Sequence, residues 1–398
     1  MRVLQVNTTL GIGSTGRIFQ DIGKMINISG GKSYLAASRN IKPNLDHVTK
    51  IGNKWDLYRH ILSTRIQDNH GFSSEASTKK FIGEIKEINP DIIHLHNIHG
   101  YYLHVGILFD FLKSSKIPVV WTLHDCWPFT GHCSYFDRVD CQKWKTQCYS
   151  CPLKSYYPKS FFKDNSKNNY FLKKESFTGL ENLIICTPSH WLKDLVKQSF
   201  LKEYPVEVIH NGIDLGIFKP RNNPNNKRVK TIRVLGVANV WDARKGFDDF
   251  IQLNDKLKGA IEITLVGVSK KLKRRIPSDI IAIERTNDIF ELATRYQKVD
   301  VFVNPTYSDN FPTTNIEALA CGTPVLTYDT GGSPEAIDQN TGICIKKGDI
   351  DGLVLAVKQI KDNPNIFSAD ACSNRAKKHF DKDQNYLSYL DLYKKILK

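Results

Sequence analysis

The stretch NPTYSDNFPTTNIEALACGTPVLTYDTGGSPEAI, residues 304–337, joins two predicted buried strands through a polar loop and a short helix. The strand VDVFVNPT (299–306) leads into it, the loop runs from Asn310 into a helix that begins near Thr313, and CGTP ends this helix before the strand PVLTYD (324–329). GGSPE then repeats the loop-to-helix arrangement. Strand–loop–helix–strand connections of this kind predict a parallel sheet with helices on both faces.

The same alternation of apolar runs and amphipathic segments extends over the whole chain. Further buried strands are predicted over residues 2–7, 32–38, 91–97, 118–125, 182–189, 206–212, 231–239 and 261–268. The Asn-, Pro- and charge-rich stretch 211–230 is interpreted as a linker. We therefore expect an α/β protein of two doubly wound, Rossmann-like domains that face each other across a cleft, with ligands beyond the carboxyl ends of the strands. The predicted N-terminal domain is 1–212, the C-terminal domain is 213–379, and a final amphipathic helix over about 380–398 crosses back to the first domain.

Composition narrows the class of protein. The chain has 398 residues, is 41% hydrophobic and carries a net charge of +15, spread over both halves. No stretch approaches the roughly 20 apolar residues of a membrane span, and the N-terminal MRVLQVNTTL is too polar for a secretion signal. We expect a cytoplasmic protein. Its positive charge suits polyanionic partners such as nucleic acid, anionic lipid or diphosphate substrates.

The stretch WTLHDCWPFTGHC (121–133) begins as a strand and ends in polar residues. His124 and Asp125 directly follow the strand, where a ligand site is expected. A histidine there can bind a substrate hydroxyl or share a proton. The alternative is that Asp125 caps the next segment beside a structural histidine.

Five of the nine cysteines fall between residues 126 and 151. Cys133, Cys141, Cys148 and Cys151 have the spacing C-x7-C-x6-C-x2-C, whose CxxC end resembles half of a four-cysteine zinc site, and Cys126 is a further possible ligand. The alternative is a set of reduced, buried thiols, because disulfides are rare in the cytosol.

Two loops have residues that suit phosphate groups. GIGSTGR (11–17) follows the first strand, and its glycines, Gly13 and Gly16 among them, let backbone amides approach an anion at a helix start, although a plain tight turn explains it equally. In VANVWDARKGFDDF, Arg244 and Lys245 stand in a strand-to-helix turn, where the alternative is a solvated basic turn.

In residues 304–337, the helix that begins near Thr313 presents amides able to hold a diphosphate. Asp309 precedes this helix, and Glu317 lies about one turn inside it, within reach of a ribose diol. The alternative is a pair of ordinary capped helices. Another segment, 153–174, carries six lysines and six aromatic residues, which predicts either a membrane-surface segment or a solvated face.

The motifs NGIDLGIFKP, KG at 245–246 and SDNFPTTNIEALACGTPV…GGSPE resemble the retaining glycosyltransferases of family 4, which have the GT-B fold. The N-terminal half, with WTLHDCWPFTGHCSYF…CQKWKTQCYSCP, is similar to the subgroup that acts in colanic-acid, capsule and O-antigen assembly. The resemblance implies that Glu317 holds the donor ribose and that Asp309, where the family has glutamate, faces the transferred sugar. It implies that His124 is the active-site histidine.

The resemblance also implies that Lys245 binds phosphate; the family's arginine position holds Val240, and Arg244 is the nearby alternative. The implied donor-binding residues are Gly13, Gly16, Arg244, Lys245, Asn310, Phe311, Pro312, Thr313, Thr314 and Glu317, and the implied catalytic residues are His124, Lys245 and Asp309.

The expected reaction is transfer of a sugar from a UDP- or GDP-sugar to a glycan, or to a lipid-linked oligosaccharide at the inner face of the cytoplasmic membrane, with retention and without a catalytic cofactor. The alternatives are a GT-B sugar-phosphate synthase or nucleotide-sugar epimerase, and a zinc-knuckle protein that binds nucleic acid. We expect no nucleic-acid partner, because the positive charge is diffuse. An NAD-type oxidoreductase is disfavoured because no GxGxxG follows a strand with an acidic residue about 20 positions on.

Overall fold

The computed structural model describes residues 1–41, 46–221 and 231–398. They divide into two compact units, Met1–Ile209 with Tyr386–Lys398, and His210–Asn385. The sequence places the domain boundaries at 212–213 and near 380. Most of the charged part of the predicted linker, 222–230, lies outside the described residues.

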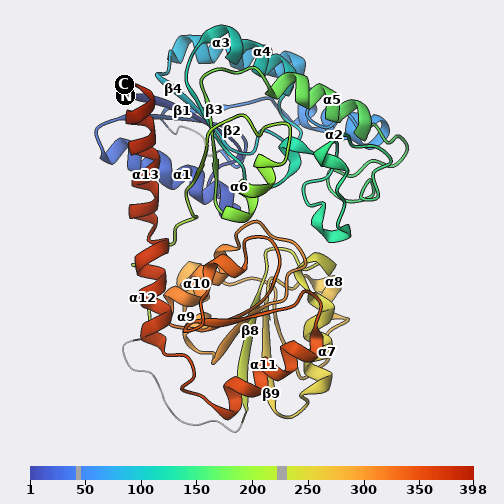
Figure 1. Ribbon diagram of the computed structural model, residues 1–398, viewed down its shortest axis with the longest axis vertical. Helices are drawn as coiled ribbons and strands as arrows, with labels where there is room; N and C mark the ends of the chain where they lie inside the picture. The colour runs from blue at the N-terminus through green and yellow to red at the C-terminus, as the bar shows by residue number, and fades with distance from the viewer. Residues whose placement is uncertain (42–45, 222–230) are drawn as a thin grey trace. The chain divides into compact units, whose positions relative to one another are not determined.

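The first unit is built on a seven-stranded sheet in which every pair of neighbouring strands is parallel. In sheet order its strands are β3 (Val48–Lys50), β2 (Lys32–Arg39), β1 (Arg2–Thr9), β4 (Ile92–Leu95), β5 (Val119–Thr122), β6 (Leu183–Thr187) and β7 (Val206–Val208). Its helices are α1 (Gly13–Ile28), α2 (Lys54–Gln67), α3 (Glu75–Ile88), α4 (Val105–Ser115), α5 (Ser166–Phe177), α6 (His190–Lys197) and most of α13 (Lys382–Ile396). Helices cover this sheet on both sides (Figure 1).

The second unit has a six-stranded sheet, also parallel throughout. In sheet order its strands are β10 (Ile281–Ile283), β9 (Ile261–Val266), β8 (Ile232–Val237), β11 (Val301–Asn304), β12 (Val325–Tyr328) and β13 (Gly342–Ile345). Its helices are α7 (Phe247–Lys256), α8 (Lys270–Lys273), α9 (Ile289–Gln297), α10 (Thr313–Ala320), α11 (Ile350–Asp362) and α12 (Ala369–Phe380).

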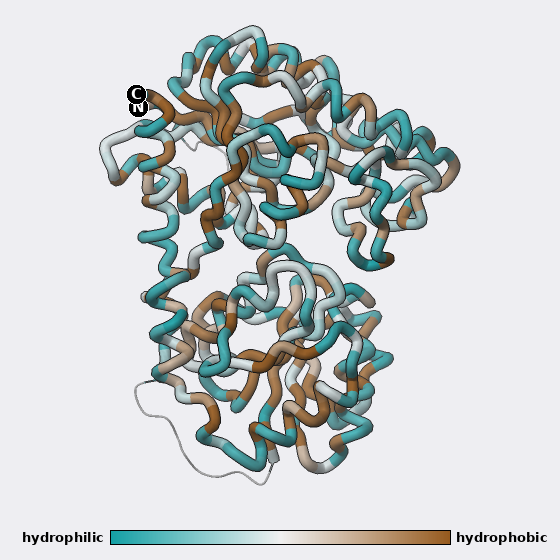
Figure 2. The backbone as a smooth tube through the Cα atoms, in the orientation of Figure 1, coloured by the Kyte–Doolittle hydropathy of each residue, from teal (hydrophilic) through white to brown (hydrophobic). Residues whose placement is uncertain are grey.

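The central strands form because they are apolar on both faces, as buried parallel strands must be. All four residues of β5 are buried, as are all four of β11. The strands accordingly form the most hydrophobic stretches of each unit (Figure 2). In each sheet the order reverses beside the first strand, at β1/β4 and at β8/β11. Loops after these strands diverge and leave room for a ligand, so both reversal points are candidate binding edges.

The structure confirms two parallel-sheet domains and corrects several details. GGSPE does not begin a full helix: Pro334–Ala336 forms a single 3-10 turn. The helix expected over about 380–398 corresponds to α13, and the extended backbone of Asp381 separates it from α12. The short strands β3, β10 and β13 were not predicted. In segment 153–174 the side chains of Tyr170 and Lys173 are buried in α5, so these two residues do not belong to an exposed face.

Candidate functional site

In the first unit, His124 and Asp125 lie just beyond β5 and are nearly buried, with 9% and 7% exposure. They do not form a dyad with each other. Asp125 Oδ1 accepts the backbone N–H of Trp127 at 2.9 Å and so caps the turn Trp127–Phe129. Asp125 Oδ2 lies 3.0 Å from His99 Nε2. Burial would raise the pKa of Asp125, but His99 and the capped N–H lower it below its ordinary value. Asp125 therefore caps the next segment, as the alternative interpretation expects, and its other carboxylate oxygen faces His99, a contact that the sequence did not indicate.

A hydrogen-bonded chain fixes the tautomer of His124. Its Nε2 lies 3.2 Å from His96 Nδ1, and His96 Nε2 lies 3.2 Å from Gln5 Oε1. The amide nitrogen of Gln5 donates to Ser33, so its oxygen faces His96. Burial keeps the pKa of His96 well below its usual value, so this ring is neutral and donates from Nε2. His96 Nδ1 must then accept from His124 Nε2–H, which leaves His124 Nδ1 as a hydrogen-bond acceptor.

Burial also lowers the pKa of His124 to about 4, so this acceptor is neutral at ordinary pH. The same polar core extends to the C-terminal helix. His94 Nδ1 lies 2.6 Å from the Tyr393 hydroxyl, and Thr122 Oγ1 lies 2.8 Å from His94 Nε2 and 3.1 Å from the Tyr389 hydroxyl.

Sequence reasoning missed the histidines behind His124. The signal was present: His94 and His96 are two residues apart in the otherwise apolar DIIHLHN, so they share one face of the sheet. A pair of polar residues on a buried face requires internal hydrogen-bond partners, and the network above supplies them.

The glycine-rich loop after β1 is a tight turn that opens α1. The Gly11 N–H donates to the Gly16 carbonyl at 3.1 Å. A Cβ on Gly16 would meet Thr9 Oγ1 at 3.0 Å, a tight contact that favours glycine at this position. Gly13 has φ of +71°, and Ile12 at the helix start supplies no side-chain cap. The first amides of α1 are therefore not capped by a side chain, as an anion-binding turn requires.

In the second unit, the turn after β8 meets the loop after β11. Lys245 ends the 3-10 helix Ala243–Lys245, and its ammonium group forms an ion pair with Asp309, both side chains being mostly buried. Arg244 donates to the carbonyl of Ser308 at 2.8 Å, and its own carbonyl accepts Tyr307 N–H at 2.7 Å. The structure thus brings Lys245, Arg244 and Asp309 together. Val240, at the family's arginine position, is 65% exposed.

Helix α10 begins at Thr313, as predicted, and its N-cap residue Pro312 gives no side-chain cap. Phe311 is 4% exposed, and its ring stacks on His210 at 5.0 Å between centroids. Phe311 and Pro312 are therefore packing residues whose backbone shapes the loop, whereas Thr313 and Thr314 are partly exposed at the first turn.

The GGSPE loop supports the loop before α10. Gly331 has φ of +56°, and a Cβ there would lie 1.6 Å from the carbonyl oxygen of Asp309. Gly332 N–H donates to the Asn310 carbonyl at 2.8 Å. Asn315 Nδ2 donates to the Ser333 carbonyl at 3.3 Å. This close approach of two backbones fixes the position of Asp309 without any side chain between them.

Glu317 lies one turn inside α10 and is 2% exposed. The hydroxyl of Tyr296, on α9, donates to Glu317 Oε2 at 2.9 Å and so orients the carboxylate. Tyr296 is a supporting residue that the sequence did not indicate.

The four predicted zinc ligands line one cavity of the first unit, together with His132 and Trp144. Gly131 N–H donates to Cys148 Sγ at 3.2 Å, and the neighbouring Cys151 and burial raise the pKa of the Cys133 thiol well above its usual value. In the part of the chain that the structure describes, no three of these sulfur atoms lie within 4.8 Å of one another. Cys126 is fully buried.

Buried ionisable side chains also hold the loop that contains these cysteines. His132 Nδ1 lies 2.6 Å from Asp68 Oδ1, and both side chains are completely buried. The fully buried Lys173 donates to the carbonyls of Trp127 and Thr130 at 2.8 and 2.9 Å. Desolvation lowers the pKa of Lys173 to about 7.

Comparison with known proteins agrees with this geometry. Residues 56–216 match the family described as Glycosyltransferase Family 4, and residues 218–379 match Glycosyl transferases group 1. WcaC of Escherichia coli K12, assigned to colanic acid biosynthesis as a glycosyl transferase, is 24% identical over 328 residues, which is 77% of each chain.

Solved structures show the same fold. A sucrose-phosphate synthase from Thermosynechococcus elongatus aligns over 99% of this chain and 98% of its own, with a TM-score of 0.73 and 15% identity. HepE of Anabaena, solved with UDP and glucose, aligns over 98% of this chain and 99% of its own, with a TM-score of 0.68 and 14% identity. The chain is therefore a glycosyltransferase of the GT-B fold, with a family 4 domain followed by a group 1 domain.

Proposed function

We propose that the protein transfers a sugar from a nucleoside-diphosphate sugar to a hydroxyl group of a glycan, with retention of the anomeric configuration. The observation that carries the proposal is the convergence of Lys245, Asp309 and the uncapped start of α10 at the reversal point of the second sheet. Family membership supports it, as do the HepE structures, which are described with UDP, with UDP and glucose, and with UDP-glucose.

The leaving diphosphate gains negative charge in the transition state. The Lys245 side chain is 19% exposed and is held by Asp309, so its ammonium group is positioned before the donor arrives. Together with the first amides of α10, it would stabilise this charge by preorganised electrostatics. Glu317, oriented by Tyr296, would accept hydrogen bonds from the ribose diol. Asp309, one carbon shorter than the family's glutamate, would hold Lys245 beside the transferred sugar.

His124 would position the sugar by accepting a hydrogen bond from it. Because its Nε2–H is used by His96, its Nδ1 can receive a hydrogen bond from a sugar hydroxyl. With its pKa near 4, His124 binds through a lone pair and not as a proton donor.

We further propose that the acceptor is a lipid-linked glycan of a bacterial surface polysaccharide, which would make the protein a peripheral membrane enzyme. The similarity to WcaC supports this class of acceptor. In the described parts of the chain, no helix is long and apolar enough to cross a bilayer.

A structural zinc ion at Cys133, Cys141, Cys148 and Cys151 is also proposed. The lining of one cavity by all four thiols supports it, as does the Gly131 N–H bond to Cys148 Sγ. Zinc binding would draw the sulfur atoms closer than they lie in this structure, since tetrahedral Zn–S bonds are about 2.3 Å.

The proposed reaction is tested by screening nucleotide sugars for thermal stabilisation and then following hydrolysis of the best donor by proton NMR. We expect a UDP- or GDP-sugar to stabilise the protein, and the first-formed free sugar to keep the donor's anomeric configuration. Inversion would contradict the retaining mechanism. Rapid turnover with a sugar phosphate as acceptor would favour the synthase alternative, and no stabilisation by any nucleotide sugar would remove the proposal.

A further inference from the structure

Helix α2 carries four large apolar residues on the side that faces away from the protein, while Leu57 and Ile61 are half-buried. Trp55, Tyr58, Leu62 and Ile66 are 75%, 61%, 59% and 44% exposed. Their spacing of three, four and four residues places them along one stripe of the helix. The fully buried side chains of the same helix include the polar His60 and Thr64.

The polar inner face is satisfied by hydrogen bonds. His60 Nε2 accepts the Gly71 N–H at 3.1 Å and its Nδ1 lies 2.9 Å from Ser74 Oγ, while Thr64 donates to the His60 carbonyl at 2.9 Å. These hydrogen bonds fix the orientation of the helix about its axis. The apolar stripe therefore faces outward because the polar side is held against the protein. A stripe of large apolar side chains on a protein surface indicates a binding surface.

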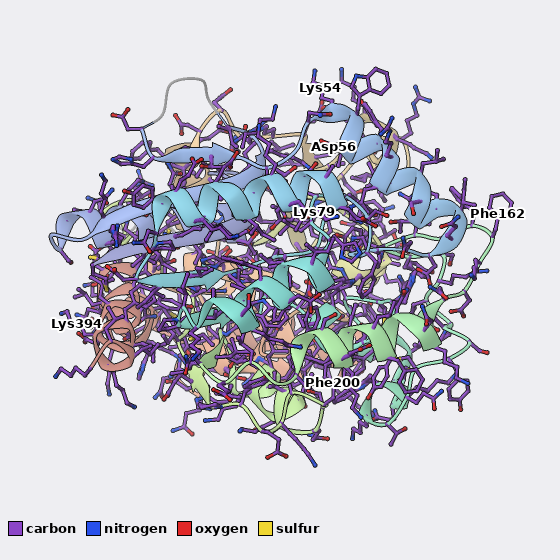
Figure 3. The ribbon with its side chains drawn as sticks, turned by 90° about the horizontal axis from the view of Figure 1, so that it is seen from above. Lys54, Asp56, Lys79, Phe162, Phe200 and Lys394 are labelled. Atoms are coloured by element: carbon purple, nitrogen blue, oxygen red, sulfur yellow. The ribbon has the colours of Figure 1, made fainter. Side chains whose placement is uncertain are left out.

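A second segment extends the stripe at the end of the helix. Phe161 N–H donates to the Arg65 carbonyl at 2.8 Å, and Arg65 donates to the carbonyl of Lys159 at 2.9 Å. Phe161 and Phe162 are 56% and 75% exposed. Lys54, at the start of α2, and Phe162, beyond its end, both lie at the periphery of the first unit in the view of Figure 3.

The charges around the stripe are almost all positive. On α2 and residues 159–163 the cations are Lys54, Arg59, Arg65, Lys159 and Lys163, and the one carboxylate is Asp56. Asp56 is used within the helix, because its side chain accepts the Asn53 N–H at 2.9 Å in the capping box. Aromatic side chains beside Lys and Arg are typical of segments that lie in the headgroup layer of a membrane.

We propose that α2 and residues 159–163 form a docking surface for the face of an anionic lipid bilayer. The helix has 14 residues, so about 21 Å of its length would lie along the membrane. The apolar stripe enters the boundary of the acyl chains, and the cations contact lipid phosphates. The proposal rests on these surface residues alone and not on the donor or acceptor of the transfer reaction.

The test is co-sedimentation of the full chain with vesicles of phosphatidylglycerol and phosphatidylcholine, and with vesicles of phosphatidylcholine alone. We expect binding to the anionic vesicles that weakens as salt rises. The double variant Trp55→Ser, Leu62→Ser should bind at least about tenfold more weakly, since each side chain contributes apolar surface on entering the bilayer. Reversal of Arg59 and Lys159 to glutamate should cost at least about fivefold for each residue.

The matched control is Ile28→Ser, because Ile28 is 81% exposed in the same unit but lies outside the stripe. Its binding should equal that of the parent. Failure of the parent to bind anionic vesicles would overturn the proposal, as would unchanged binding of the double variant. A homodimer that the double variant dissociates, without vesicle binding, would show that the stripe is covered by a second copy. Hydrolysis of a soluble nucleotide sugar should survive in every variant, which separates this test from that of the transfer reaction.

Discussion

Acidification should destabilise the first unit because several of its histidines are buried in neutral form. Burial lowers the pKa of His60 and of His94 from 6.5 to about 3, and the pKa of His124 to about 4. These rings are neutral in the folded protein at pH values where the unfolded chain already binds protons. For these groups, stability is complete above about pH 6.5 and is lost as the pH falls through the window between 6.5 and the folded pKa.

The magnitude follows from the width of this window. Each pKa unit corresponds to about 1.4 kcal/mol, so lowering the pH from about 7 to about 5 should cost about 2 kcal/mol for each of the three histidines, or about 6 kcal/mol together. His132 acts in the opposite direction. Burial would lower its pKa, but its bond with Asp68 raises it, so it offsets part of the loss. Since domains are stable by only about 5–15 kcal/mol, the remaining effect is large.

The assay is urea unfolding at the two pH values, followed by tryptophan fluorescence, which reports on the buried Trp121, Trp127 and Trp144 of this unit. The variant His60→Asn should make the free energy of unfolding depend less steeply on pH, by the contribution of one proton. This holds whatever the stability of the variant at neutral pH. The variant His47→Gln, at an exposed position, should leave the dependence unchanged. A free energy of unfolding that stays constant between the two pH values would refute the neutral, buried state of these histidines.

Three further predictions concern the sites. Lys245→Ala should lower kcat about a hundredfold or more with a smaller change in KM, because the charge on the leaving group grows in the transition state; steady-state kinetics showing only a raised KM would contradict this role. Gly331→Val should destabilise the second unit by about 2–4 kcal/mol and weaken nucleotide binding, because its Cβ would overlap the Asp309 carbonyl; an unchanged melting temperature would be inconsistent with the packing. Protein purified without chelator should contain about one equivalent of zinc, lost in Cys148→Ser but kept in Cys344→Ser, as measured by elemental analysis; absence of zinc from the parent would favour plain thiols.

The sequence could predict the architecture because the central strands are short and uniformly apolar. β5 and β11 are buried along their whole lengths, and each stands out as a short, mainly apolar run. Strands β3 and β10 have three residues each with partly exposed side chains, so no hydrophobic pattern marks them. The start of α10 was predictable because Pro312 directly precedes it, a position that proline tolerates.

The site residues that directly follow strands could be predicted from the sequence. The contacts between residues that lie far apart in the chain could not. Lys245 and Asp309 could each be assigned to a strand end, but their ion pair depends on the tertiary meeting of two loops. The tautomer of His124 depends on Gln5, which is 119 positions away in the chain, through His96. The sequence shows the spacing of the apolar residues that form the stripe of α2. Only the burial of His60 shows which side of the helix faces the protein.

The central claim is that the second unit binds a nucleoside-diphosphate sugar at the start of α10. Calorimetric titration of UDP and GDP into the protein and the variant Glu317→Gln tests it most directly, because this substitution keeps the shape that Tyr296 contacts and removes the charge. We predict that one nucleotide binds the parent and binds the variant about tenfold or more weakly. The variant Glu284→Gln, at an exposed position of the same unit, should bind like the parent. Equal affinity of the parent and Glu317→Gln, or no binding of either nucleotide, would contradict the claim.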